Sequence, residues 1–156
     1  MRKTFIRQKV YIVIAVLLTG ILFSSCRYEV PGKKRLEVIS GIAAVVNDNY
    51  SSEDVETPYD ISMTEIDELT DKDSNLHKAI EKYHDVQNYH VYLIENNNVL
   101  IVTDSFFQAV KGYVVSDEEL KGTIKVPGIG FDNSSITILE RVGDSNSNIY
   151  SFSAGN

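Results

Sequence analysis

The sequence predicts an α+β fold in which N-terminal helices are followed by an antiparallel β-meander of about five or six strands, in a single domain. Two observations indicate this. Apolar residues recur at helical spacing in two segments between residues 36 and 86, whereas from residue 89 onward they follow the period of two that is typical of strands. Clusters of Asn, Gly, Ser and Pro separate the later segments, as turns require. A curved sheet backed by a helix is one arrangement that satisfies both patterns.

Three helices are expected. The first covers residues 36–50, although Gly41 weakens it and its β-branched run also suits a buried strand. A short second helix follows Ser62, because Ser62 and Glu65 have the spacing of a capping box. The third, residues 74–86, is the clearest. It has a polar cap and one apolar face, formed by Leu76, Ala79, Ile80, Tyr83 and Val86.

The first expected hairpin lies in the segment NYHVYLIENNNVLIVTD. Residues 89–95 and 99–103 form its two strands, because both are rich in β-branched and aromatic side chains. The three asparagines between them tolerate the left-handed backbone angles of a tight turn. This region therefore predicts the start of the antiparallel sheet.

The remaining strands follow from the same kind of pattern. Residues 106–110 are expected to form a short crossing segment or a helical turn, and residues 112–116 and 123–126 to form strands. Pro127 and Gly128 suit a type II turn. The segments ITILERV and IYSFSAG, joined by GDSNSN, predict a final hairpin.

The N-terminus has the composition of an export signal. Residues 1–9 carry four basic and no acidic side chains, and residues 11–23 are apolar apart from Thr19 and Gly20. An apolar run of this length is too short for an ordinary membrane-spanning helix, which needs about 20 residues. The pattern is typical of a secretory signal peptide, so we expect the protein to be exported.

The end of this run, FSSC, resembles the lipobox of bacterial lipoproteins, in which small residues precede a cysteine that is acylated and becomes the first residue after cleavage. Cys26 is the only cysteine of the chain, so it has no partner for an intrachain disulfide. The resemblance implies a palmitate-type lipid on Cys26 and anchoring to a bacterial membrane of the cell envelope. Secretory cleavage near Ser25 and an uncleaved N-terminal anchor are the alternatives.

The resemblance also divides the chain. Residues 1–25 are the expected signal peptide, residues 26–35 a lipidated tether, and residues 36–156 a single acidic α+β domain. Arg27 follows the cysteine, where many lipoproteins retained in the inner membrane have Asp. The resemblance therefore implies the outer membrane, if the cell has one.

The charge of the chain excludes some classes of partner. The formal net charge is −7, and because residues 1–25 contain four basic and no acidic residues, it becomes −11 after their removal. Nucleic acid is not expected as a partner, because phosphate binding needs clustered Lys and Arg. The acidity also disfavours electrostatic attachment to anionic lipid headgroups, so membrane association is expected to depend on the lipid anchor itself.

An acidic stretch covers residues 48–73, which contain ten carboxylates and a single lysine, Lys72. One interpretation is a docking face for a cationic partner or a divalent-ion site. The other is a solvated surface that keeps the domain soluble. Asp71, Asp73 and Asn75 begin like a calcium-binding loop, but Leu76 replaces the required glycine and Lys82 the bidentate glutamate, so helix capping explains them better.

Catalytic and metal-binding motifs are incomplete. His77, His84 and His90 have neither an HExxH pattern nor a supporting carboxylate triad, so no metal site is predicted. No GxSxG or SxxK surrounds any serine, and GIGFDN lacks the third glycine of a phosphate-binding loop.

The sequence therefore predicts a lipid-anchored envelope protein that is not an enzyme, has no cofactor, and binds an envelope protein partner or serves a structural role. The alternative is a lipoprotein that binds a cation or small ligand through residues 48–73.

Overall fold

The computed structural model describes residues 32–106, 109–129, 135–144 and 147–155. The chain divides into two compact units, Met1–Gly32 and Lys33–Asn156, and the description below concerns the second. The predicted signal peptide and Cys26 lie outside the described residues.

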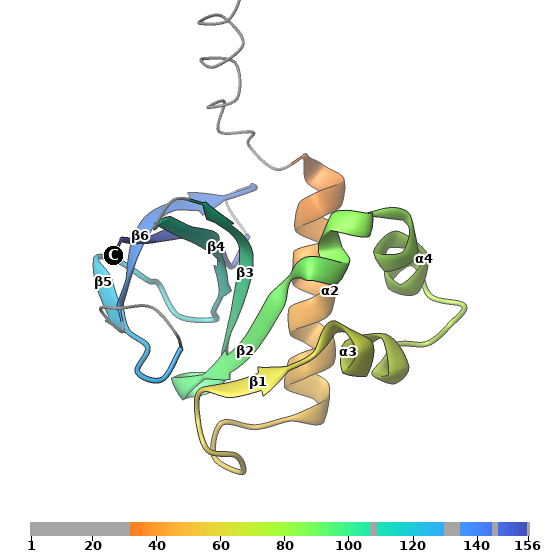
Figure 1. Cartoon of the computed structure of the whole chain (residues 1–156), viewed down its shortest axis with the longest axis horizontal. Coiled ribbons are helices and arrows are strands. Elements are labelled where there is room, and N and C mark those ends of the chain that lie inside the picture. The colour runs from red at the N-terminus through yellow and green to blue at the C-terminus, as the bar shows by residue number, and fades with distance from the viewer. Residues whose placement is uncertain (1–31, 107–108, 130–134, 145–146, 156) are drawn as a thin grey trace, which may run out of the picture. The chain divides into compact units, whose positions relative to one another are not determined.

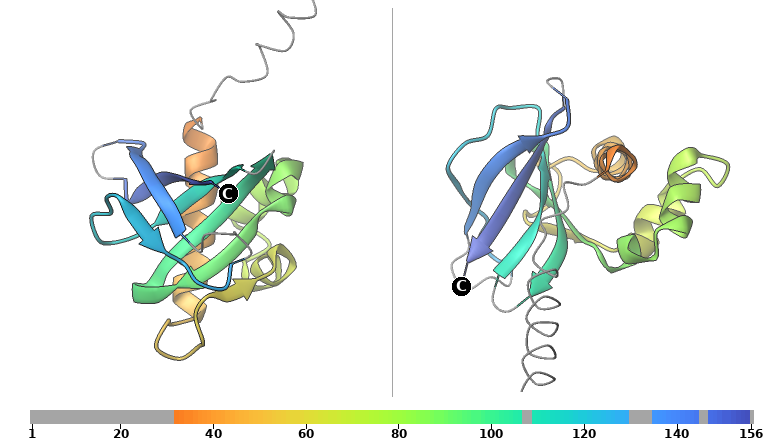
Figure 2. Two further views of the ribbon diagram at one scale, coloured as in Figure 1. Left: turned by 60° about the vertical axis from the view of Figure 1, so that its left-hand side comes forward. Right: turned by 90° about the horizontal axis from the view of Figure 1, so that it is seen from above.

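Helix α2 (Lys33–Asn49) confirms the first predicted helix and excludes a strand there. Its buried stripe consists of Val38, Ile39, Ile42, Ala43 and Val46. Because these residues recur every three or four positions, a helix places them on one side. In Figures 1 and 2, α2 lies between the sheet and two shorter helices.

Those shorter helices begin at the serines that the sequence indicates. In α3 (Met63–Leu69), Oγ of Ser62 accepts a hydrogen bond from the backbone N–H of Glu65. In α4 (Asn75–Lys82), Oγ of Ser74 accepts one from the N–H of His77. The third helix is shorter than predicted, because after Lys82 the chain tightens into the 3₁₀ helix η1 (His84–Asn88).

Among the described residues, seven antiparallel strands form one sheet in the order β1-β2-β3-β4-β7-β6-β5. The asparagine turn is confirmed as η2 (Glu95–Asn97), in which Asn96 and Asn97 have φ of 60° and 55°. The strands are β1 (Tyr59–Ile61), β2 (His90–Ile94), β3 (Asn98–Phe106), β4 (Ala109–Val115), β5 (Thr123–Lys125), β6 (Ser135–Val142) and β7 (Ile149–Gly155).

The predicted fold class is wrong in its sheet, although the chain is roughly α+β. The sheet has seven strands rather than five or six, and it is not a meander, because β7 lies between β4 and β6. Nor do the strands all follow the helices, since β1 precedes α3 and α4. Three residues are too few to show a periodicity, and β1 owes its conformation to pairing with β2, where Tyr59 lies opposite Leu93.

Residues 107–108 of the expected crossing segment lie outside the described residues, and its described residues are strands instead. The backbone of Phe106 in β3 pairs with that of Ala109 in β4. The register shifts between Val102 and Asp104 in β3, and again between Ile138 and Glu140 in β6. Such irregularities bend strands, and the sheet curls into a half-barrel (Figure 1).

Both faces of the curled sheet are buried, because alternate side chains of the central strands enter different apolar clusters. The helix-side cluster lies between the sheet and the helices, and includes Ile39, Ile42, Val91, Leu93 and Ile101. The sheet-interior cluster fills the curl, and includes Leu100, Val114, Ile136 and Phe152. The two sheet edges approach each other near Pro58, because a Cβ on Gly128 would lie 3.5 Å from its Cγ.

Candidate functional site

A groove between α2 and α4 forms a hollow on the described surface, with a cavity volume of about 420 Å³. Its floor is apolar and its rim is basic. The side chain of Leu76 in α4 packs against Gly41 of α2. A Cβ added to Gly41 would lie only 2.8 Å from Cδ1 of Leu76. The glycine that weakens α2 as a helix thus permits α4 to approach. The floor consists of Val38, Leu76 and Ala79, and the rim includes Lys34, Lys78 and Lys82.

The three rim lysines are exposed, and within the described part of the chain none has a carboxylate at ion-pair distance. Nζ of Lys78 donates to the backbone carbonyl of Asp73 at 3.0 Å. Nζ of Lys82 lies 6.0 Å from the ring centroid of Tyr83. One carboxylate, Glu37, also lines the groove. The groove therefore has three lysines, one carboxylate and an aliphatic floor. These features suit a negatively charged ligand that also carries an apolar part.

The basic start of α2 is not explained by the stability of the helix. Lys33, Lys34 and Arg35 occupy its first turn, which contains no acidic residue, and its last turn contains no basic one. Cations near a helix N-terminus oppose the helix dipole, by roughly 0.3–1 kcal/mol each at the surface. Only Arg35 has a partner that offsets this, since it forms an ion pair with Asp85 at the start of η1.

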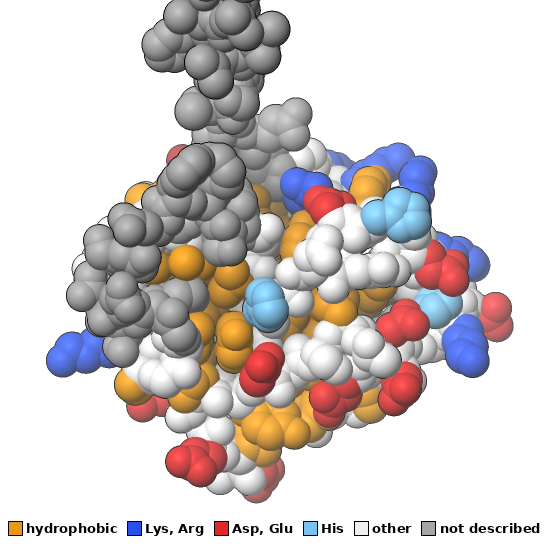
Figure 3. Space-filling view, in the orientation of Figure 1, with side chains coloured by type: hydrophobic (Ala, Val, Ile, Leu, Met, Phe, Trp, Pro, Cys, Tyr) orange, Lys and Arg blue, Asp and Glu red, His pale blue; other side chains and the backbone are white. Residues whose placement is uncertain are grey.

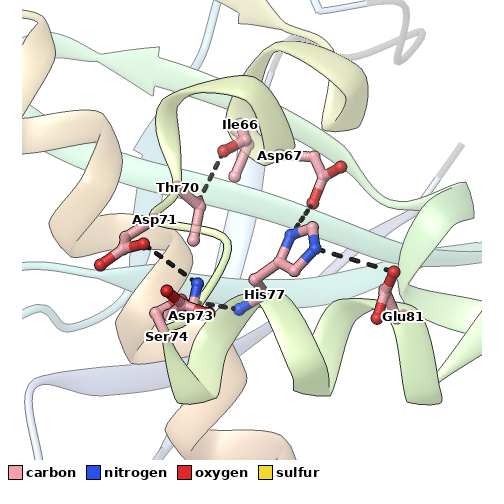
Figure 4. Close-up of polar contacts among 8 residues, drawn as sticks. All are labelled: Ile66, Asp67, Thr70, Asp71, Asp73, Ser74, His77 and Glu81. Carbon is pink, nitrogen blue, oxygen red and sulfur yellow. Dashed lines mark hydrogen bonds and ion pairs between the residues drawn. The ribbon is translucent and has the colours of Figure 1, made fainter.

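A second polar cluster joins α3 to α4 (Figure 4). The imidazole of His77 has its Nδ1 2.7 Å from Oδ1 of Asp67, and its Nε2 3.7 Å from Oε1 of Glu81. Its side chain is 15% exposed, whereas Asp67 and Glu81 are 42% and 68% exposed. The first contact is a hydrogen bond and the second is too long for one. This geometry ties the two short helices together.

The turn between α3 and α4 is held by local bonds. The hydroxyl of Thr70 donates to the carbonyl of Ile66 at 2.6 Å, and Oδ1 of Asp71 accepts from the N–H of Asp73 at 3.0 Å. Of the side chains that resembled the opening of a calcium loop, Asp71 thus holds the turn before α4, whereas the cap of α4 is Ser74. Across the described residues, no three His, Cys, Asp or Glu side chains are grouped as a metal site would require.

The carboxylates of residues 48–73 are divided among separate structures. Asp48 lies in α2 and Asp60 in β1, Asp67 contacts His77, and Glu65 accepts a hydrogen bond from the hydroxyl of Tyr50. That hydrogen bond raises the pKa of Tyr50 to about 12, with smaller contributions from burial and from the charge of Glu65. The described side chains therefore give no support to a cation site in this stretch.

The sequence did not single out the groove, although one signal was present. Lys78 and Lys82 are four residues apart, which puts them on the same face of α4. The basic residues 33–35 were expected at the end of a tether, and they belong to the first turn of α2. Both sets meet at the groove where Leu76 packs on Gly41. Of the other histidines, His84 lies in η1 and His90 begins β2, and both are exposed.

No protein-family model matches this chain, and neither a curated protein nor a solved structure is detectably similar to it. In the described part of the chain, no helix has both the length and the apolar character needed to cross a membrane.

Proposed function

We propose that this is an exported, lipid-anchored protein of a bacterial cell envelope, and that its domain is a non-catalytic module that binds a partner protein or stabilises an assembly. The observation that carries the proposal is the position of Cys26. It directly follows a basic and apolar leader, and the compact unit begins only seven residues later, at Lys33. A lipid on Cys26 would thus hold the domain through a very short connection.

Within the described part of the chain, both apolar clusters are built from residues between Leu36 and Ala154. A single acyl chain binds a membrane only marginally, whereas two or three chains hold firmly, so a diacyl or triacyl cysteine suffices as an anchor.

Metabolic labelling tests the anchor. Full-length protein and the Cys26→Ala variant are expressed in a bacterium that processes lipoproteins, in the presence of an alkyne-tagged fatty acid. We expect label on the parent and none on Cys26→Ala. Ser25→Ala is the matched control, because it keeps a small residue before the cysteine, and it should stay labelled. Label that survives in Cys26→Ala would refute the proposal, as would an unchanged mass when lipoprotein signal peptidase is inhibited.

Crosslinking in living cells tests the binding role. Full-length protein is crosslinked and captured beside Cys26→Ala, and the captured proteins are identified by mass spectrometry. We expect a reproducible envelope partner that is lost when the lipid is absent. Confirmed labelling without any such partner would contradict the binding role and leave the anchor standing.

A further inference from the structure

We propose that the groove between α2 and α4 lies against the anionic phospholipid headgroups of the membrane that anchors the protein. The contact surface, called here the basic face, is defined by Lys34, Lys78 and Lys82 around the floor formed by Val38, Leu76 and Ala79. This inference rests on the proposed lipid anchor, because the anchor supplies the membrane.

The separation of charge along α2 favours an orientation in which the basic start of the helix faces the membrane. The helix has 17 residues and is therefore about 25 Å long. Its first turn is basic, and beyond its end the chain carries Glu53, Asp54 and Glu56 with no Lys or Arg before Lys72. In Figure 3, Lys and Arg side chains gather at the upper right. Asp and Glu lie among them along the right side and dominate the lower part.

Because screening acts over about 8 Å at physiological ionic strength, the two ends of the domain respond to a charged surface separately. An anionic membrane attracts the basic end and repels the acidic end. The net negative charge of the whole domain therefore does not prevent a local contact with the membrane.

The covalent connection brings this end of the domain to the membrane. Lys33 follows Cys26 by seven residues, so the two lie within about 25 Å of each other in any arrangement of the chain. The lysine of α2 at the rim, Lys34, is the next residue. Of the two ends of α2, the basic one is therefore the end that the lipid restrains.

The composition of the groove suits a headgroup region better than free solvent. Lys34, Lys78 and Lys82 have no carboxylate partner in the described structure, so phosphate groups would meet them without breaking an ion pair. Lysine stems lie along apolar surface while their ammonium groups contact a polar layer. Glu37 is the one opposing charge that lines the groove. An acidic peptide could use the same chemistry, and the experiment separates the two.

The test measures how fast each lysine reacts on vesicles. Full-length lipidated protein is inserted into vesicles of phosphatidylcholine alone, or of phosphatidylcholine with one third phosphatidylglycerol, and treated with an amine-reactive ester. Mass spectrometry gives the rate for each lysine. On the anionic vesicles we expect Lys34, Lys78 and Lys82 to react at least about threefold more slowly. Lys121 and Lys125 lie away from the basic face and should not change. High salt should abolish the difference.

Two matched variants sharpen the test, and in both the measured lysine is Lys33. It begins α2 beside Lys34, so in the parent it should also react more slowly on anionic vesicles. Lys34→Gln/Lys78→Gln/Lys82→Gln removes the basic face, and Lys72→Gln/Lys121→Gln/Lys125→Gln removes the same charge elsewhere. Both sets of lysines are exposed, so both proteins should fold. We expect the slowing of Lys33 on anionic vesicles to be lost in the first variant and kept in the second.

The outcomes separate this inference from the proposed function. Protein that fails to float with phosphatidylcholine vesicles has no lipid anchor, which would refute the proposed function. Protein that floats while its lysines react equally on both kinds of vesicle would overturn the membrane-facing groove and leave the anchor standing. The groove would then face solvent, and an acidic peptide would be the remaining candidate ligand for it.

Discussion

The helix-side cluster and the sheet-interior cluster use the same kinds of side chain but are assembled differently. The helix-side cluster is closed by α2, α3, α4 and η1, whose apolar residues are neighbours along each helix. The sheet-interior cluster is closed by the sheet itself, since Leu100 of β3 packs with Ile136 and Phe152, which come from β6 and β7 much later in the chain. The first cluster therefore depends on local patterns, and the second on register and curvature.

The comparison explains why the period of two expected from residue 89 onward is interrupted in β2 and β3. Segments such as VYLI and VLIV are continuously apolar, because alternate residues of β2 and β3 enter the two clusters. A strand that is buried on both faces has no solvent-facing side, so its sequence does not alternate between apolar and polar residues. Curling, rather than a second layer of helices, covers the interior face.

A large effect is predicted at Gly112, where β4 meets β3 in the sheet. A Cβ there would lie 2.0 Å from the carbonyl oxygen of Ile101 and 2.8 Å from Cε1 of Phe152. Backbone cannot move aside as a flexible side chain can, so we expect Gly112→Ala to lower the free energy of unfolding by about 3 kcal/mol. Urea denaturation measures this.

Gly122→Ala serves as the control for this substitution. Gly122 has open space around it and a φ of +73°, so only backbone strain of about 1 kcal/mol is expected. Equal losses of unfolding free energy in the two variants would show that the close approach of the Ile101 carbonyl to Gly112 does not limit the side chain at this position.

A matched pair of isoleucines compares the clusters directly. Ile42 in the helix-side cluster and Ile136 in the sheet-interior cluster are both fully buried. Each Ile→Ala change should lower the free energy of unfolding by about 2–5 kcal/mol, and the losses should add to within about 0.5 kcal/mol in the double variant. If either variant fails to fold, Ile→Val at the same positions should lower it by about 0.5–1.5 kcal/mol.

Hydrogen exchange then shows whether the two clusters open separately. We expect Ile42→Ala to speed exchange mainly in α2, α3 and α4, and Ile136→Ala to speed it mainly in β5 and β6. Identical exchange patterns in the two variants would mean that the domain opens as one unit and that the two clusters do not unfold separately.

The smallest predicted effect is a loss of stability at high pH that originates in the helical layer. The pKa of Tyr50 is raised to about 12 by its hydrogen bond to Glu65. A folded-state pKa above the unfolded value of about 10 means that this stabilisation is complete below pH 10 and is lost as the pH rises toward 12. Tyr50→Phe should flatten the stability curve in that range, as measured by urea denaturation at several pH values.

Spectroscopy supplies an independent check on the same bond. Absorbance of tyrosinate should show a late-ionising tyrosine in the parent that is missing from Tyr50→Phe. Glu65→Gln should shift that ionisation to lower pH, because the acceptor loses its charge. An unchanged titration in both variants would contradict the bond.

Local chemistry was enough to predict much of the secondary structure. The apolar stripe of α2, the caps at Ser62 and Ser74, and the turn at Asn96 and Asn97 each depend on a few neighbouring residues, and the structure contains all of them. The capping box at Ser62 is only half formed, because Glu65 accepts from Tyr50 instead of from Ser62. Even a short motif is altered when a distant side chain offers a better partner.

The sequence by itself determined the caps of α3 and α4, the pairing of β2 with β3 and of β6 with β7 as hairpins, and the acidity of the chain. Only the tertiary structure decided that β1 joins β2, that β7 enters between β4 and β6, and that the lysines of α2 and α4 share one groove. The physical reason is range. Caps and turns act over a few residues, whereas strand order, curvature and the meeting of two helices depend on contacts between residues far apart along the chain.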